Sequence, residues 1–228
     1  MSFHQMLHDA TANERAALLA QPLFADAMSG RVTRPLYCAF LAQAYHHVRH
    51  TVPLMMAAGG RLGTDYEWLR EKLVHYVEEE YGHHEWVLDD IRAAGGDVDA
   101  VRRSEPAFPT EMMIAYAYDT VQRGNPVGFF GMVHVLEGTS TALATRAASS
   151  LAVALQLPPR AFTYLSSHGA LDVQHVDFFR ELVDAFDKPS DRAAVIHASR
   201  RFYRLYGDIF AHLHRENSAC NSPIAAAC

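Results

Sequence analysis

The spacing of apolar residues is the feature that most limits how this chain can fold. Apolar side chains recur at intervals of three and four along the sequence, and no stretch alternates Val, Ile or Thr with polar residues between hairpin turns. The first spacing places apolar side chains on one face of an α-helix, whereas the second pattern marks a half-buried strand. The sequence therefore predicts an all-α protein.

Proline, glycine and capping residues divide the chain into about seven helices, with one further short helix near residues 22–27. We expect helices over residues 3–20, 22–27, 34–56, 66–93, 110–123, 127–155, from 159 onward, and 192–214. No internal repeat or linker interrupts this series. We therefore predict one helical-bundle domain over residues 1–215, followed by a Ser/Asn/Ala-rich tail over 216–228 that is expected to be disordered.

Composition excludes several classes of protein. The 228 residues suit one domain with a sizeable core, and a net charge of −6 without a basic stripe argues against a nucleic-acid partner. The longest apolar runs are far shorter than the roughly 18 residues that span a bilayer, and the N-terminus lacks the apolar core of a signal peptide. We expect a cytoplasmic protein with no membrane partner. The three cysteines form neither a disulfide framework nor a CxxC motif.

Three candidate metal ligands follow one another near residue 170. His168, Asp172 and His175 have offsets of 0, 4 and 7, which place them within roughly 60° of one another on one helical face. Imidazoles and a carboxylate are good ligands for a borderline divalent metal. The alternative is a surface cluster joined by i, i+4 hydrogen bonds.

A second motif is the Glu80-x-x-His83 pair, whose spacing lets one helix present a carboxylate and an imidazole to a shared metal. A solvated, Glu-rich face is the alternative, and Glu79 or His84 could point inward instead. Gly82 would cost about 1 kcal/mol relative to Ala inside a helix, so we expect it to serve a purpose such as a close backbone approach.

Glu137 and His134 are the polar exceptions in an apolar run over residues 129–138. A carboxylate buried there must be paired, protonated or bound to metal. A salt bridge to an Arg is the alternative for Glu137, and His134 is either a ligand or a hydrogen-bonded core histidine. Earlier in the chain, His47 and His50 share one side of a helix, so either could line a pocket.

The order of these motifs resembles the heme-oxygenase-like diiron oxidases and oxygenases. These iron-containing redox enzymes are grouped with TenA-like and PqqC-like proteins, and the resemblance covers nearly the whole chain. It implies a seven-helix heme-oxygenase-like, or TenA-like, bundle with iron ligands at Glu80, His83, Glu137, His168, Asp172 and His175. Members often have a further carboxylate; here one such position holds Tyr76, and His47 is the candidate substitute.

The resemblance implies a non-heme diiron enzyme with two Fe(II) per chain and O2 as co-substrate. It would oxidise a small organic substrate, namely an amino acid, an amine or a fatty-acid-like molecule. Long amphipathic helices favour a homodimer. The alternatives are a metal-free TenA-like binder or regulator and a cofactorless oxidase or hydrolase. Thiamin-fragment hydrolysis is disfavoured, because Ala44 stands where thiaminase-type TenA proteins carry Asp and no Cys accompanies Glu137.

Overall fold

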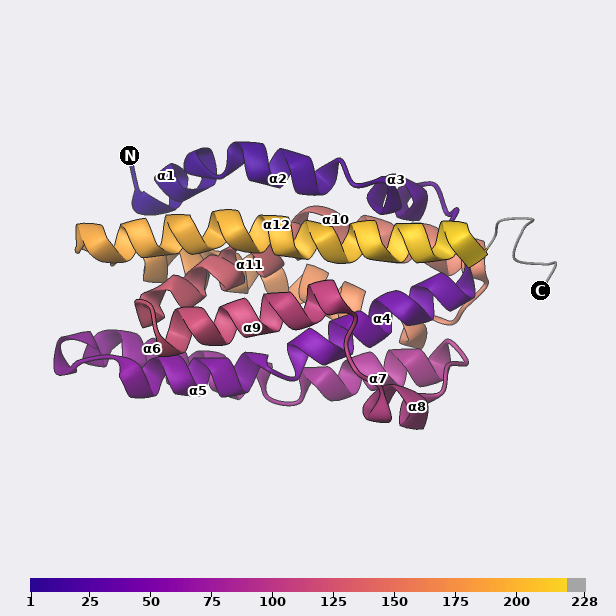
Figure 1. The fold of residues 1–228 in the computed structure, drawn as a ribbon, viewed down its shortest axis with the longest axis horizontal. Coiled ribbons are helices and arrows are strands. Elements are labelled where there is room, and N and C mark those ends of the chain that lie inside the picture. Colours follow the sequence, from indigo (N-terminus) through magenta and orange to yellow (C-terminus); the bar gives the residue numbers. More distant parts are fainter. Residues whose placement is uncertain (221–228) are drawn as a thin grey trace.

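The computed structural model describes residues 1–220, apart from the side chains of 140–143, 145, 167–176, 219 and 220. Over these residues the predicted all-α class is confirmed, with no strand, and most helices run along the long axis (Figure 1). The helices are α1 (Phe3–Ala10), α2 (Ala12–Leu19), α3 (Pro22–Met28), α4 (Arg34–Val48), α5 (Thr51–Arg61), α6 (Glu67–Glu80), α7 (His83–Ala93), α8 (Val98–Arg103), α9 (Phe108–Gln122), α10 (Phe130–Leu155), α11 (Thr163–Asp184) and α12 (Pro189–Cys220). Short 3₁₀ turns precede three of them: η1 (Thr64–Tyr66), η2 (Pro126–Phe129) and η3 (Pro159–Ala161).

Three of the expected long helices are each broken into two, which is why the helix count exceeds seven. The first breaks at Thr11, whose hydroxyl donates to the Leu7 carbonyl at 2.8 Å. The second breaks before His50, whose ring Nδ1 lies 3.0 Å from the Tyr118 hydroxyl. The third breaks at Gly82, which has a φ of +95°. Apolar spacing continues through all three breaks, so it does not reveal them.

Two other boundaries differ from expectation. The segment between the expected helices over 66–93 and 110–123 contains a further helix, α8, which begins where the Asp97 side chain accepts a hydrogen bond from the Ala100 amide at 2.9 Å. At the other end, α12 runs past residue 215 to Cys220, so residues 216–220 of the expected tail are helical. Residues 221–228 lie outside the described part of the chain.

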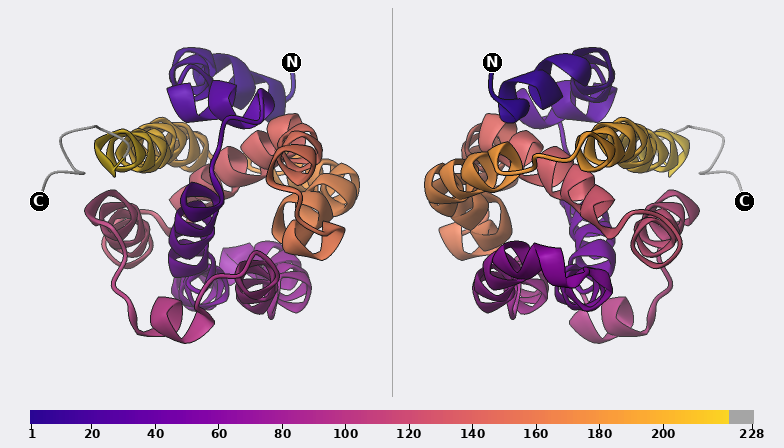
Figure 2. Two further views of the ribbon diagram at one scale, coloured as in Figure 1. Left: turned by 90° about the vertical axis from the view of Figure 1, so that its right-hand side faces the viewer. Right: turned by 90° about the vertical axis from the view of Figure 1, so that its left-hand side faces the viewer.

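The centre of the molecule is built from helices in close contact. In the end-on views α4 lies near the middle (Figure 2), and it packs against α7, α9 and α12. The helix α10 packs against both α11 and α12, and a Cβ added at Gly131 would lie 2.6 Å from the Ser199 amide nitrogen of α12. The two backbones therefore meet with no side chain between them.

The start of α11 is held by a carboxylate from α7. The amides of Thr163 and Tyr164 donate to the two oxygens of Asp90 at 2.9 and 2.8 Å. These bonds satisfy amides that the first turn of a helix leaves without helical partners. Asp90 is fully buried, and burial raises the pKa of its carboxyl to about 6.

In the part of the chain that the structure describes, none of the helices combines the length and the apolar character that crossing a membrane requires.

Candidate functional site

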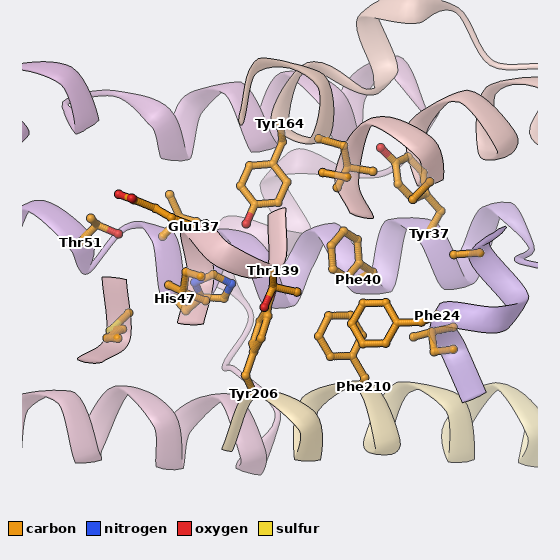
Figure 3. Close-up of a pocket in the computed structure, with 18 of the residues that line it drawn as sticks. Phe24, Tyr37, Phe40, His47, Thr51, Glu137, Thr139, Tyr164, Tyr206 and Phe210 are labelled. Carbon is orange, nitrogen blue, oxygen red and sulfur yellow. The ribbon is translucent and has the colours of Figure 1, made fainter. Parts of the chain in front are cut away.

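A cavity of about 150 Å³ lies between α3, α4, α5, α6, α10, α11 and α12. Its lining is largely apolar, and the carboxylates and the imidazole that line it come from α4, α6 and α10. In Figure 3, Thr51, Glu137 and His47 lie toward one end, and Phe24 and Tyr37 toward the other. The cavity therefore has a polar end and an apolar end.

His47 is the histidine of α4 that reaches the cavity. It is buried, and its ring meets the Tyr206 ring edge-on with centroids 6.0 Å apart. Its neighbours point elsewhere: His46 Nε2 lies 3.0 Å from the Ser104 hydroxyl, and His50 contacts Tyr118. Of the two residues expected on one side of this helix, His47 lines the cavity, whereas His50 contacts Tyr118 of α9.

Glu80 and His83 lie on either side of the break between α6 and α7. Glu80 Oε2 is 3.0 Å from His83 Nδ1, and both side chains are largely buried. The spacing predicted that one helix presents both side chains, but Glu80 lies on α6 and His83 lies on α7. Gly82 instead turns the backbone through the left-handed region. A Cβ there would meet nothing within 4 Å, so the expected close backbone approach is wrong and the positive φ explains the glycine.

The alternatives at this turn differ in exposure. Glu79 Oε1 lies 3.3 Å from His75 Nε2, while Glu80 lines the cavity. His83 is buried, whereas the side chain of His84 is 36% exposed. The structure therefore turns Glu80 and His83 toward the interior.

Glu137 lines the polar end of the cavity from α10. Its charge acts on the buried phenol of Tyr76 on α6: burial, followed by the Glu137 charge, raises the pKa of Tyr76 well above its ordinary value. The charges of Glu80 and Glu79 act in the same direction. Position 76, where the family resemblance suggested another carboxylate, thus holds a neutral phenol among carboxylates.

A model of one protein family matches residues 38–207 of the chain, which is most of its length and includes His47, Glu80, His83 and Glu137. That family is the iron-containing redox enzymes. This chain belongs to it. A search of curated proteins found no match.

Solved structures confirm the fold of this iron-containing redox enzyme. A domain of unknown function with a heme oxygenase-like fold from Shewanella denitrificans OS217 is 22% identical, with a TM-score of 0.85, covering 97% of this chain and 96% of that one. A TenA homologue from P. horikoshii OT3 is 10% identical, with a TM-score of 0.78 and coverage of 94% and 99%. Heme oxygenase from Leptospira interrogans is 15% identical, with a TM-score of 0.73 and coverage of 93% and 100%.

His134 of this redox enzyme lies away from the cavity. Its Nε2 is 3.4 Å from the Thr11 hydroxyl and 3.5 Å from the Tyr203 hydroxyl, and its ring stacks on Phe179. Burial lowers the pKa of His134 to about 3, so the ring is neutral. The structure therefore places His134 in the role of a core histidine rather than beside Glu137 as a ligand.

The predicted ligands His168, Asp172 and His175 belong to α11, but their side chains lie outside the described residues. The backbone of α11 packs against both α10 and α7. Among the described side chains, no group of three or more His, Cys, Asp and Glu is close enough to hold a metal ion.

The aromatic lining of the cavity was not singled out by sequence reasoning. Tyr206, Phe24 and Phe210 come from α3 and α12, which are far apart in the chain. Nothing in the spacing of these residues separates them from ordinary core aromatics. Their role becomes visible only when the helices are assembled.

Proposed function

We propose that this protein is a non-heme diiron oxidoreductase that uses O2 to oxidise a small organic substrate held in the cavity. The observation that carries the proposal is that His47 and Glu137 lie toward one end of an apolar cavity that Glu80 also lines, with His83 in contact with Glu80. Four helices supply these side chains. Helical bundles build dimetal carboxylate sites in this way.

The donor set fits iron. Neutral imidazoles together with carboxylates suit Fe(II), and no Lys or Arg is among the described residues that line the cavity. The residues proposed to hold two Fe(II) ions are Glu80, His83, Glu137, His168, Asp172 and His175, with His47 as an additional ligand. Iron bound here would supply the electrons that activate O2.

The surrounding residues would prepare this site. Glu80 accepts a hydrogen bond from His83 Nδ1, which fixes the tautomer and leaves the lone pair on Nε2. The buried phenol of Tyr76 stays protonated near the Glu137 carboxylate, so it adds no further negative charge to the site. The apolar walls exclude water from the reacting groups, which protects a strong oxidant from side reactions.

Iron content tests the proposal. Protein reconstituted with Fe(II) without oxygen should hold about two irons per chain by metal analysis, the number that a dimetal bundle site takes. It should then consume O2. Glu137→Gln should lower the iron content, because the amide is a weaker ligand than the carboxylate. Glu111→Gln, at an exposed position of α9, should match the wild type.

Two results would count against the proposal. Wild-type protein that holds much less than one iron per chain would favour the metal-free TenA-like binder. Equal iron content in Glu137→Gln and Glu111→Gln would show that the ligand assignment is wrong.

A further inference from the structure

One tyrosine of α12 lies in the middle of the cavity. Tyr206 extends from α12 between His47, at the polar end, and Phe210, at the apolar end (Figure 3). Its ring meets the His47 ring edge-on with centroids 6.0 Å apart, and it meets the Phe210 ring edge-on with centroids 4.9 Å apart. Contacts on two sides hold the ring, and they therefore also fix the place of its hydroxyl group.

The Tyr206 hydroxyl differs from the hydroxyls of other buried tyrosines. The Tyr37 hydroxyl donates to the Ala161 carbonyl at 2.7 Å, and the Tyr203 hydroxyl lies 3.5 Å from His134 Nε2. The Tyr206 hydroxyl makes no hydrogen bond to the part of the chain that the structure describes, although the residue is 8% exposed and counts among the core. A buried O–H group without an acceptor is costly, so we expect a bound molecule to supply one.

The cavity has room for such a molecule. Its volume is about 150 Å³, and an apolar cavity of that size binds a molecule about as large as one six-membered ring. Thr139, which also lies in the middle of the cavity, donates its hydroxyl to the Val135 carbonyl at 2.6 Å. Tyr206 therefore presents a hydroxyl that is not already donated within the described chain, in otherwise apolar surroundings, which is how ligand sites fix the orientation of what they bind.

The charges around the cavity indicate what kind of acceptor fits. No Lys or Arg is among the described residues that line it, and Glu80 and Glu137 are both carboxylates. A carboxylate of the ligand held at Tyr206 would have no cationic side chain from the described residues beside it, and burying it would be costly. A neutral oxygen accepts a hydrogen bond from a phenol without this cost.

We propose that Tyr206 is a specificity-determining residue that donates a hydrogen bond to a neutral carbonyl oxygen of the substrate, as in a ketone, ester or amide. The bond would hold that oxygen midway between the carboxylates and imidazole of the polar end and the aromatic rings of the apolar end. That the ligand is the substrate rests on the proposed function, whereas the hydrogen bond depends only on the cavity and this hydroxyl.

A pair of small molecules with nearly the same shape tests the hydrogen bond without relying on catalysis. Cyclohexanone has a carbonyl oxygen, whereas methylenecyclohexane has a CH2 group in its place. Calorimetric titration of the full chain gives the ratio of their dissociation constants. This ratio should favour the ketone about three- to tenfold more in the wild type than in Tyr206→Phe, because the variant lacks the donor. Equal ratios in the two proteins would overturn the proposal.

Tyr37→Phe is the matched control. Tyr37 lines the same cavity, but its hydroxyl already donates to the Ala161 carbonyl. The ratio for this variant should therefore equal that of the wild type. A shift as large as that of Tyr206→Phe would show that the preference for the ketone does not come from Tyr206, and would contradict the assignment.

Thermal unfolding without any ligand supplies a second measurement. Tyr206→Phe should melt at or above the wild-type temperature, because it removes a donor that has no acceptor in the described chain. Tyr37→Phe should melt below the wild type, because the Ala161 carbonyl loses its donor. A clear loss of melting temperature in Tyr206→Phe would show that its hydroxyl is bonded within the protein, which would overturn the proposal.

Titrations of metal-free and iron-loaded protein separate this inference from the proposed function. A preference for the ketone that depends on Tyr206, in a protein that takes up no iron, would support the hydrogen bond and remove the diiron assignment. Iron uptake with equal ratios in the wild type and Tyr206→Phe would do the reverse.

Discussion

Gly82 shows how a single residue shapes the candidate site. Its φ of +95° lets the chain leave α6 and enter α7 within two residues, which brings Glu80 and His83 to 3.0 Å from each other. A residue with a Cβ adopts this conformation at a cost of roughly 1–2 kcal/mol. The contact between a carboxylate and an imidazole is therefore a consequence of the backbone at one glycine.

Gly82→Ala should lower the free energy of unfolding by roughly 1–2 kcal/mol, because the positive φ disfavours any side chain although space is available. Gly60→Ala is the control: Gly60 is helical, a Cβ there meets nothing within 4 Å, and the change should stabilise the protein by about 0.5–1 kcal/mol. Chemical denaturation measures both values. Equal effects would refute the role given to the turn.

At the scale of elements, Asp90 joins α7 to α11. The helix that contributes His83 thereby fixes the first turn of the helix that contains His168, Asp172 and His175. Burial raises the pKa of Asp90 to about 6, above the roughly 3.9 of an unfolded chain. The folded state therefore favours the protonated carboxyl. Keeping the carboxylate charged lowers the free energy of unfolding above pH 6, and this loss disappears as the pH falls from 6 toward 4.

Asp90→Asn removes this charge and one of the two acceptors. Its destabilising effect relative to the wild type should therefore be smaller near pH 7 than near pH 4, where the wild-type carboxyl is already neutral. Denaturation at the two pH values measures the difference. The control Asp99→Asn changes an exposed carboxylate on α8, so its effect on the free energy of unfolding should be small at both pH values. A larger effect of Asp90→Asn at pH 7 would contradict the sign.

At the scale of the whole molecule, the contact at Gly131 determines how closely the two long helices α10 and α12 pack. A Cβ at this position would lie 2.6 Å from the Ser199 nitrogen and 2.8 Å from the Val195 carbonyl oxygen. Both atoms belong to a helix backbone, which cannot move aside as a flexible side chain can. The crossing of these two long helices therefore depends on the absence of a side chain.

Gly131→Ala should destabilise the protein by roughly 1–3 kcal/mol, the usual cost of overpacking a core, and lower its melting temperature. Gly138→Ala on the same helix is the comparison, since a Cβ there meets nothing within 4 Å. That variant should melt at or slightly above the wild-type temperature. Equal melting temperatures for the two variants would show that the close approach of α10 and α12 does not require glycine at position 131.

Part of this architecture could be predicted from the sequence. Apolar spacing was enough for the all-α class, and the isolated carboxylate of Glu137 in an apolar run indicated a residue that needs partners. Apolar spacing did not distinguish a glycine inside a helix from one between two helices. The single helix expected over residues 66–93 was therefore wrong at Gly82. It also did not show which way His134 points, because burial on either face of α10 produces the same pattern.

The aromatic lining of the cavity was beyond sequence reasoning for a different reason. Phe24 and Phe210 are separated by most of the chain, and each one alone resembles a core aromatic. Only the packing of α3 against α10 and α12 brings their rings together.

The position of α3 has a consequence for how this protein could acquire new substrates. Its residues shape the far end of the cavity, while the predicted iron ligands all lie on other helices. Under the proposed function, substitutions in this short helix would change which molecule the cavity accepts and leave the predicted iron ligands unchanged. The two properties can be varied separately, by selection or by a protein engineer.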